Sequence, residues 1–331
     1  MVKSVTMSDV AKDMGVSTVT VSKAITGKDG VSSEMREQII ARAAEMGYEY
    51  TKGKETVNSV KTQNIGIIIM ERFISDDAFY SKICQGIVRQ LMTVNAVGLL
   101  EMVPRNDEKK GVIPQLIQNE RVDGLILLGQ MDKNYTDIVT KQGIPYIYLD
   151  TYREGEKTDS VVSDSVQGAY MLTKMLLDKG HTDIGFVGSY NATSSIMDRY
   201  LGFTKALLEK GLTVRPKCVI EDRDENGKFV PVDYPKDMPT AFVCNCDSLA
   251  FNMINDLKKM GFSIPEDIEI VGFDDSIHAV LSDPNLTTYR VDIDGMVKNA
   301  VNIILNKIED RNYAIGKVVV EGDIIIREST K

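Results

Sequence analysis

Four charged side chains lie near the carboxyl ends of predicted strands, where parallel sheets place their ligand-binding residues. They are Asp150, Arg199, Asp247 and Asp274. A carboxylate or a guanidinium group forms two hydrogen bonds in one plane, a geometry that matches two neighbouring hydroxyl groups. These residue types therefore predict a site for a polyol such as a sugar.

Each of the four residues also has a purely structural interpretation. An aspartate or arginine near a strand end can cap a loop or form a surface ion pair. Asp247 can equally be the N-cap of a helix. The sequence leaves both interpretations open.

Residues for catalysis or metal binding do not come together in the sequence. His181 and His278 have no carboxylate at a metal-ligand spacing, and neither a Gly-rich phosphate loop nor a nucleophile with its base is visible. Cys244 and Cys246 lack a second pair, so we expect the four cysteines to be buried, reduced thiols. We predict a protein without enzymatic activity, cofactor or metal ion.

The elements that position the four charged residues are apolar strands that alternate with amphipathic helices. The predicted strands are 64–70, 97–102, 122–128, 145–149, 184–187, 240–243, 268–271, 317–320 and 324–326. The predicted helices are 79–94, 111–119, 134–142, 166–179, 195–210, 249–260 and 295–308. This rhythm predicts an α/β fold with two lobes, each a doubly wound parallel sheet, that enclose a cleft. Residues 222–238 lack apolar periodicity and predict an irregular loop.

The first 48 residues predict three short helices around a small core. Thr6 and Asp9 have the spacing of a capping box, Gly15 and Ser17 separate the first two helices, and Ser32 caps the third. The predicted inward faces consist of Val10, Ala11, Met14, Val21, Ala24, Ile25, Ile39, Ile40, Ala43 and Met46. This is helix-turn-helix geometry, although a three-helix interaction module has the same pattern.

Charge is distributed unevenly along the chain. Residues 1–63 contain nine Lys and Arg against eight Asp and Glu, whereas the remainder contains 30 against 40. Because an acidic surface repels phosphate, nucleic acid would have to bind the N-terminal segment. The composition is globular, no apolar run is long enough to span a membrane, and no N-terminal signal segment is visible. We therefore expect a cytoplasmic protein.

The N-terminal pattern resembles the headpiece of the LacI/GalR family of bacterial transcription regulators. The resemblance is carried by residues 5–11, 15–23 and 31–32 with Arg36, Ala43, Gly47 and Tyr48. It implies that the second helix enters the major groove of DNA. The implied base-reading residues are Thr18, Val19 and Lys23, and the implied phosphate contacts are Ser17, Thr20, Ser22 and the helix N-termini, the first of which begins at Thr6.

The rest of the chain resembles the periplasmic-sugar-binding-protein fold of the same family. The markers are 122–126, 144–145, 180–181, 199–203, 239–242, 271–275 and 286–291. The resemblance implies that Asp150, Arg199 and Asp274 bind hydroxyl groups of a sugar.

Three further residues are candidates on the same resemblance. Phe79 and Tyr80 lie where the family often has an aromatic ring that stacks on the sugar, although both could pack beneath the loop 71–78. Asp247 is a weaker candidate, because the family usually has Asn where this chain has Cys246.

The linker between the two regions departs from the family pattern. The family has a short hinge helix here that inserts a Leu into the minor groove of DNA, and this chain has Val57 at that position. Gly53 disfavours a helix and Glu55 repels phosphate. We expect Val57 to act as a smaller wedge in a weaker hinge helix.

We therefore predict three regions: a helix-turn-helix headpiece (1–48), a hinge (49–63) and an effector-binding and dimerisation region (64–331). The expected lobes are about 64–160 with 292–322, and about 161–291 with 323–331. The resemblance implies a homodimeric regulator, by family precedent a repressor, whose affinity for operator DNA responds to a sugar or sugar derivative. The alternative is a cytosolic ligand sensor with a degenerate headpiece that acts through protein partners.

Overall fold

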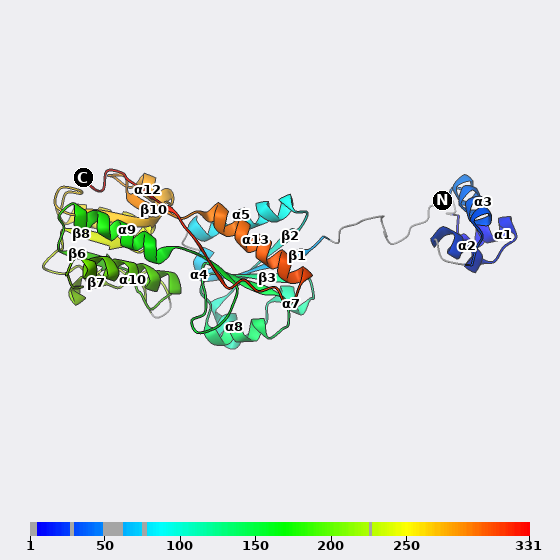
Figure 1. Ribbon diagram of the computed structural model, residues 1–331, viewed down its shortest axis with the longest axis horizontal. Coiled ribbons are helices and arrows are strands. Elements are labelled where there is room, and N and C mark those ends of the chain that lie inside the picture. Colours follow the sequence, from blue (N-terminus) through cyan, green and yellow to red (C-terminus); the bar gives the residue numbers. More distant parts are fainter. Residues whose placement is uncertain (1–4, 27–29, 49–61, 75–77, 225–226) are drawn as a thin grey trace. The chain divides into compact units, whose positions relative to one another are not determined.

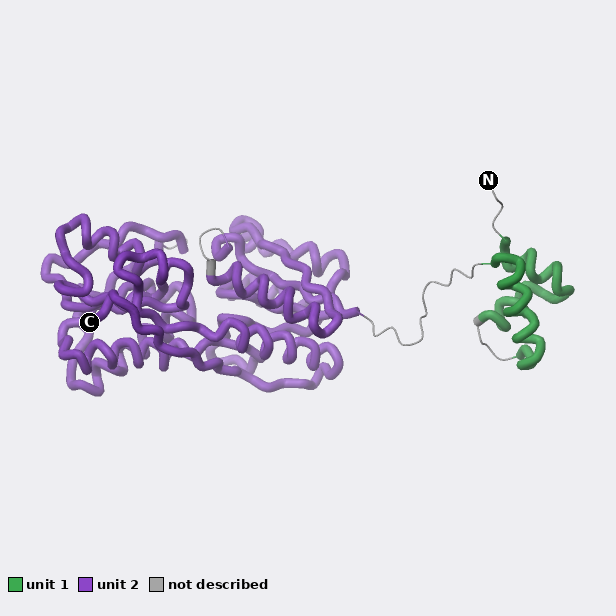
Figure 2. Tube along the Cα trace, turned by 90° about the horizontal axis from the view of Figure 1, so that it is seen from above, with its two compact units in different colours: residues 1–61 green, residues 62–331 purple. Residues whose placement is uncertain are grey.

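The computed structural model describes residues 5–26, 30–48, 62–74, 78–224 and 227–331. The chain divides into two compact units, residues 1–61 and residues 62–331, which are coloured separately in Figure 2. Gly53, Glu55 and Val57, on which the prediction of a weak hinge helix depends, lie outside the described residues.

The first unit contains three helices: α1 (Met7–Met14), α2 (Thr18–Thr26) and α3 (Ser33–Glu45). Thr6 and Asp9 form the predicted capping box, in which Thr6 N–H donates to Asp9 Oδ2 at 2.8 Å and Asp9 N–H donates to Thr6 Oγ1 at 3.3 Å. Gly15 ends α1 with φ +64°, a conformation that glycine adopts without strain. Ser32 caps α3 through the N–H of Met35.

A small apolar core holds these helices together. Its buried members are Val10, Ala11, Val21, Ala24, Ile39 and Ala43. All six belong to the predicted inward faces. Ile40 does not, because its side chain is 48% exposed, and the prediction that it is buried is wrong. Ile40 is the residue after Ile39, and successive residues of an α-helix point about 100° apart around the helix axis. The two side chains therefore point in different directions.

Two six-stranded sheets form the second unit (Figure 1). The first sheet has the order β11-β5-β4-β3-β1-β2 and is parallel throughout. Its strands are β1 (Asn64–Met70), β2 (Val97–Val103), β3 (Gly124–Leu128), β4 (Tyr146–Leu149), β5 (Ser160–Ser163) and β11 (Lys317–Val320). The central strands are almost wholly buried, as expected of parallel strands with helices on both faces.

The second sheet has the order β12-β10-β9-β8-β6-β7, and only β12 is antiparallel to its neighbour. Its strands are β6 (Ile184–Val187), β7 (Val219–Ile220), β8 (Ala241–Cys244), β9 (Glu269–Asp274), β10 (Thr287–Arg290) and β12 (Asp323–Ile325). The predicted fold class, two doubly wound lobes behind a helix-turn-helix unit, is confirmed.

The helices divide between the two sheets. The first lobe has α4 (Glu71–Ile74), α5 (Ala78–Thr93), α6 (Arg105–Lys110), α7 (Gln115–Gln118), α8 (Lys133–Thr140) and α13 (Ile293–Glu309). The second lobe has α9 (Ser165–Asp178), α10 (Ser194–Glu209), a short 3-10 helix (Pro216–Cys218), α11 (Asp247–Lys259) and α12 (Ile277–Leu281). In Figure 1, α5 and α13 lie on one side of the first sheet and α8 lies on the other.

The chain crosses between the lobes three times, after β5, after β10 and after β11. Strand β5 therefore extends the first lobe to residue 163, three residues beyond the expected boundary. Strands β5 and β10 are absent from the predicted strands, because Ser and Thr make up half of their residues and hide the apolar pattern.

One predicted helix is wrong. Residues 111–119 do not form a helix; instead α6 ends at Gly111, whose φ is +68°, and the four-residue α7 starts after Pro114. Between β7 and β8 the described residues contain only an isolated bridge from Arg223 to Phe229, so the predicted irregular loop is confirmed there.

Candidate ligand-binding and nucleic-acid-binding sites

Two of the predicted aspartates adopt unusual backbone conformations at strand ends. Asp150 follows β4 with φ +59°, and Asp274 ends β9 with φ +107°. Residues other than glycine rarely adopt positive φ, and such strain concentrates at functional sites. Both side chains are buried, at 4% and 8% exposure. The parallel sheets thus bring Asp150 from the first lobe and Asp274 from the second to carboxyl edges that face each other.

Arg199, in the second turn of α10, links these loops. Its Nη1 donates to the backbone oxygen of Asn245 at 2.5 Å and its Nη2 donates to Asp274 Oδ1 at 3.3 Å. The guanidinium carbon lies 3.9 Å from the centre of the Phe273 ring. Arg199 is 5% exposed, and its Nε donates to no described residue. The guanidinium plane is therefore held rigidly, with a donor to spare for a ligand.

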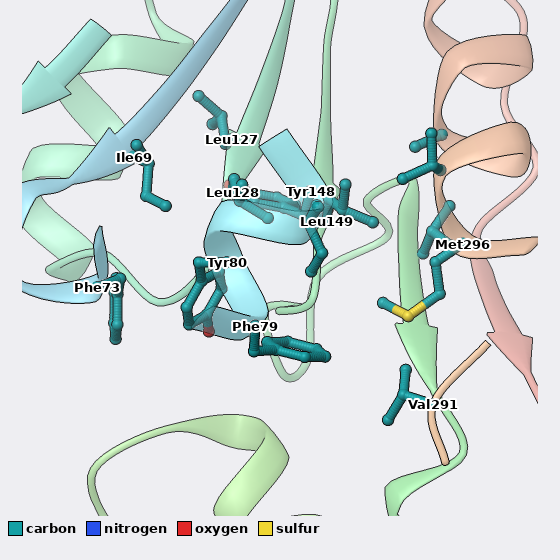
Figure 3. Close-up of a cluster of buried hydrophobic side chains, with 14 of the residues drawn as sticks. Ile69, Phe73, Phe79, Tyr80, Leu127, Leu128, Tyr148, Leu149, Val291 and Met296 are labelled. Carbon is teal, nitrogen blue, oxygen red and sulfur yellow. The ribbon is translucent and has the colours of Figure 1, made fainter. Parts of the chain in front are cut away.

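The aromatic candidates form one wall of the same site. Tyr80 donates its hydroxyl to Asp150 Oδ2 at 2.8 Å. Its ring centre lies 4.9 Å from that of Phe73 and 5.4 Å from that of Phe79. Figure 3 shows Phe73, Phe79 and Tyr80 beside the apolar core of the first lobe. Phe79 and Tyr80 thus belong to the apolar core of the first lobe and also line the cavity described below.

Five of the six predicted ligand residues line one cavity between the lobes. These are Phe79, Tyr80, Asp150, Arg199 and Asp274. The cavity has a volume of about 50 Å³. That is room for a few water molecules, since one water needs ~10–15 Å³ on the same measure. A sugar can therefore enter only when the lobes move apart.

Asp247 does not line this cavity, and we withdraw it as a ligand residue. Its Oδ1 accepts the hydroxyl hydrogen of Thr288 at 2.6 Å, and its Oδ2 accepts the N–H of Ser276 at 2.6 Å. It is the first residue of α11, where the N-cap is Cys246 and not Asp247. The carboxylate thus ties α11 to β10 and α12. Burial raises the pKa of Asp247 to about 7, against the hydrogen bonds from Thr288 and Ser276, which lower it.

We expect Asp247→Asn to remove a pH-dependent part of the stability. An aspartate whose pKa rises on folding stabilises the protein below its unfolded pKa of 3.8, and that stability is lost as pH rises through the folded pKa of about 7. The free energy of unfolding of the variant minus that of the wild type should therefore rise from pH 4 to pH 7, by at most ~1.4 kcal/mol per pH unit. Denaturant unfolding at several pH values measures this difference, and a difference that stays constant contradicts it.

Several residues at this cavity are missing from the prediction made from the sequence. Asn245 donates its side-chain N–H to Asp222 Oδ2 at 2.9 Å, and Arg223 donates its Nε–H to the same oxygen at 3.2 Å. Arg223, Asn245 and Arg72 all line the cavity. Asp222 is fully buried two residues after the end of the two-residue strand β7, which is too short to show in an apolar pattern. That strand end is the signal that could have identified Asp222 and Arg223.

The lobes also meet beside the cavity through polar contacts. Tyr152 of the first lobe donates its hydroxyl to Asp198 Oδ1 of α10 at 2.8 Å. The hydroxyl groups of Thr151 and Ser194 lie 3.4 Å apart, and Thr151 also donates to Gln130 Oε1 at 2.9 Å. The Tyr152–Asp198 and Thr151–Ser194 contacts have to break or lengthen when the lobes separate, so they favour the closed form.

The outer surface of α2 carries the predicted DNA contacts. Val19 is 62% exposed and is therefore accessible to a partner. Ser17 caps the helix start, since its Oγ accepts the N–H of Thr20 at 3.1 Å and lies 2.8 Å from the Thr20 hydroxyl. The side chain of Lys23 extends toward Gly30. A Cβ atom added to that glycine would lie 3.2 Å from Lys23 Nζ.

The remaining predicted DNA contacts are Thr6, Thr18, Ser22 and Val57. Thr6 uses its hydroxyl to donate to Asp9 Oδ2 at 2.6 Å, so its oxygen already serves the capping box. Thr18 is exposed at the start of α2, and Ser22 is half-buried in the same helix. Val57 lies outside the described residues.

All four cysteines are buried and free, as predicted: Cys84, Cys218, Cys244 and Cys246. No three His, Cys, Asp or Glu side chains gather as a possible metal site in the part of the chain that the structure describes. Within the same part, no helix combines the length and apolarity needed to cross a bilayer.

A helix-turn-helix unit joined to two lobes around a polar cavity defines a DNA-binding regulator that responds to a small ligand. Comparison with known families agrees. Residues 6–49 match the model of bacterial regulatory proteins of the lacI family, and residues 173–330 match the periplasmic binding protein-like domain. The chain thus combines a DNA-binding region of the lacI type with a periplasmic binding protein-like domain.

Curated relatives resemble the chain over nearly its whole length. The HTH-type transcriptional repressor PurR of Photobacterium profundum is 27% identical over 332 residues, which cover 98% of each chain. The ribose operon repressor of Haemophilus influenzae is 28% identical over 329 residues, again 98% of each.

Solved structures share the fold. The regulator CelR in complex with cellobiose has a TM-score of 0.70 at 23% identity, over 98% of this chain and 99% of that one. The lac repressor dimer bound to operator and an anti-inducer has a TM-score of 0.68 at 22% identity, over 99% of both chains.

Proposed function

We propose that this regulator is a repressor that binds operator DNA as a homodimer and changes its affinity when a sugar binds between the lobes. The observation that carries the proposal is the convergence of Asp150, Arg199 and Asp274 with the rings of Phe79 and Tyr80 on one cavity. Three planar charged groups and a ring wall suit the hydroxyl groups and the C–H face of a sugar.

The charges around the cavity favour a neutral ligand. Each arginine that lines it has a carboxylate partner: Arg72 with Glu108, Arg199 with Asp274, and Arg223 with Asp222. No arginine is left over to balance an anionic group. The paired charges also hold one another in fixed positions, which lowers the cost of ordering them around a ligand.

The closed cavity explains how a sugar could control DNA binding. A ligand shifts a conformational equilibrium only by its difference in affinity for the two forms. Because the cavity of about 50 Å³ is too small for a sugar, the described conformation and the loaded one must differ in how far the lobes are apart. Family relatives named repressors, among them the ribose operon repressor, support repression as the outcome.

An apolar surface at the edge of the first lobe supports a dimer. Strand β2 is the edge strand of its sheet, and α5 packs beside it. Four apolar side chains are exposed there, and we call them the apolar edge patch: Val88, Met92, Leu100 and Met102. Gly98, on the same side of β2 as Leu100 and Met102, faces Leu91 and Val88 of α5, so the patch is continuous. An exposed apolar edge strand aggregates unless a partner covers it, and we propose a second copy of the chain as that partner.

The proposal has two finer parts. We propose that the chain has no enzymatic activity, because the relatives that it resembles over nearly its whole length are named as repressors. We propose that it acts in the cytoplasm, where operator DNA is accessible.

Two experiments test the proposal. Full-length protein should retard its own upstream region in a gel shift, with an affinity that falls steeply as salt concentration rises. A thermal-shift screen against monosaccharides and disaccharides should reveal a stabilising sugar, by about 2.7 kcal/mol at a concentration of 100 times Kd. No preference for any duplex over random competitor would favour the alternative, a ligand sensor that acts through protein partners.

We expect Lys23→Ala to weaken operator binding by about 1–3 kcal/mol and to relax specificity at one base pair. Lys23 is the longest donor that α2 offers, and a lysine can donate to guanine O6 and N7. Gel shifts with single base-pair variants of the operator measure both effects. Equal weakening on every sequence, with a reduced salt slope, would instead identify Lys23 as a phosphate contact.

A further inference from the structure

A second cavity between the lobes adjoins the first and has no role in the proposed function. Its volume is about 320 Å³, at the lower end of the range that drug-sized ligands occupy. Thr193 lines both cavities, and the chain passes from one to the other along Asp150, Thr151 and Tyr152. We call the first the inner cavity and the second the outer cavity.

The outer cavity contains a rigid aromatic surface. Tyr190, in the loop between β6 and α10, stacks on Tyr200 with ring centres 4.7 Å apart and an angle of 18° between the planes. Tyr200 in turn contacts Phe186 of β6 at 5.4 Å. One face of the Tyr190 ring is therefore held from behind, and Tyr190 lines the outer cavity. A held ring is a platform for the C–H face of a sugar.

Residues of both lobes surround this platform. Tyr152 and Glu154 come from the first lobe, whereas Tyr190 and Asn191 come from the second. Neither Asn191 nor Glu154 forms a hydrogen bond or ion pair with a described residue, so their polar groups are available to a ligand. Arg153 is balanced by Glu156 and Asp137. The charged residues of the lining also balance in number, with Lys133 and Arg153 against Glu154 and Glu156, so the outer cavity suits a neutral ligand with hydroxyl groups.

The largest cavity between the lobes, about 890 Å³, lacks such a platform. Its one aromatic side chain, Tyr135, is 1% exposed and presents no ring face. Charged side chains dominate its lining, among them Lys109, Lys110 and Glu221. It therefore gives no reason to place a sugar ring there.

We infer that the effector contains at least two sugar rings: one in the inner cavity, bound by Arg199 and Asp274, and the next in the outer cavity against Tyr190. This inference rests on the proposed function and specifies its ligand as a di- or oligosaccharide. The outer ring touches both lobes. It therefore adds a second contact that depends on their separation, which increases the difference in affinity between the two forms.

Calorimetric titration of the full chain with matched sugars tests the inference. The probes are D-glucose with cellobiose and maltose, D-xylose with xylobiose, D-mannose with mannobiose, and D-galactose with lactose. For the pair that binds, the disaccharide should bind at least about tenfold more tightly than its monosaccharide. Tyr190→Ala should remove about tenfold of the disaccharide affinity and change the monosaccharide affinity less than twofold.

Two further variants separate stacking from folding. Tyr190→Phe keeps the ring and should bind the disaccharide as the wild type does. Tyr170→Ala removes a tyrosine of α9 that lines neither cavity, and should change nothing. Equal affinity for monosaccharide and disaccharide, or an equal loss of both in Tyr190→Ala, overturns the inference and leaves the proposed function standing. Failure of every sugar to bind overturns the proposed function as well.

Discussion

Replacing Arg199 with alanine will abolish the response of operator binding to the effector and leave operator binding by the ligand-free protein intact. Coupling between two sites is typically ~1–3 kcal/mol, so the sugar should change the operator affinity of the wild type about 5- to 150-fold. In Arg199→Ala we expect a change of less than about twofold. Gel shifts at several sugar concentrations measure the response, and calorimetry with the same sugar measures binding itself.

The reason lies in the contacts of the guanidinium group. It joins the loop after β8, through the backbone oxygen of Asn245, to the end of β9, through Asp274. Arg199 also lines the inner cavity, and its Nε donates to no described residue. Alanine removes the donors that a polyol would meet and the link between two loops that the polyol would contact. The DNA-binding unit has a core of its own and loses no contact.

Stability needs a separate measurement, because the substitution leaves the 8% exposed Asp274 without this cation. Removing one partner of a buried ion pair costs about 3–5 kcal/mol. Arg199→Lys is the matched control: it keeps the charge and lacks the planar fork of donors, so most of the stability should return while the sugar response stays weak. A normal sugar response in Arg199→Ala would show that the inner cavity is not the effector site.

How much of this site follows from the sequence depends on the length of the strand beside each residue. Asp150 follows a strand of four residues and Asp274 ends a strand of six, and both strands are largely apolar, so the positions of these residues at a carboxyl edge can be predicted. Because β4 and β9 are parallel to their neighbours, the same reasoning places both residues at the cleft. Asp222 and Arg223 follow a strand of two residues in front of an irregular loop, and no pattern of side chains marks that edge.

Asp247 shows a different limit. Asp247 comes soon after an apolar strand, as Asp150 does, yet its carboxylate binds Thr288 and Ser276 and it does not line the inner cavity. Those partners lie 41 and 29 residues further along the chain, in β10 and in the loop before α12. The periodicity of apolar residues indicates which face of a helix or strand is apolar. It does not identify hydrogen-bond partners that are so far away in the sequence. The exposed apolar side chains of β2 are equally ambiguous in sequence. A strand with alternating apolar and polar residues has the same sequence whether a helix or a second chain covers its apolar face.

Charging the apolar edge patch will dissociate the dimer and lower operator affinity. Met92 and Leu100 are 72% and 45% exposed, one on α5 and one on β2, so the double variant Met92→Glu, Leu100→Glu disturbs neither core. In a dimer it places four carboxylates in one apolar interface, where desolvation and mutual repulsion both oppose association. Light scattering coupled to size exclusion should show a monomer where the wild type is a dimer.

The effect on DNA follows from the number of headpieces. A dimer that holds one half-site presents the second headpiece to the other half-site at an effective concentration in the millimolar range, which raises affinity about 10²–10⁴-fold over one headpiece. The monomeric variant should therefore bind a full operator no better than an isolated half-site, with affinity lowered by that factor. Leu208→Glu is the matched control, because Leu208 is an equally apolar and 61% exposed residue on α10 of the other lobe, away from the patch. A double variant that remains dimeric, or that binds the full operator as tightly as Leu208→Glu does, would remove the apolar edge patch from the dimer interface.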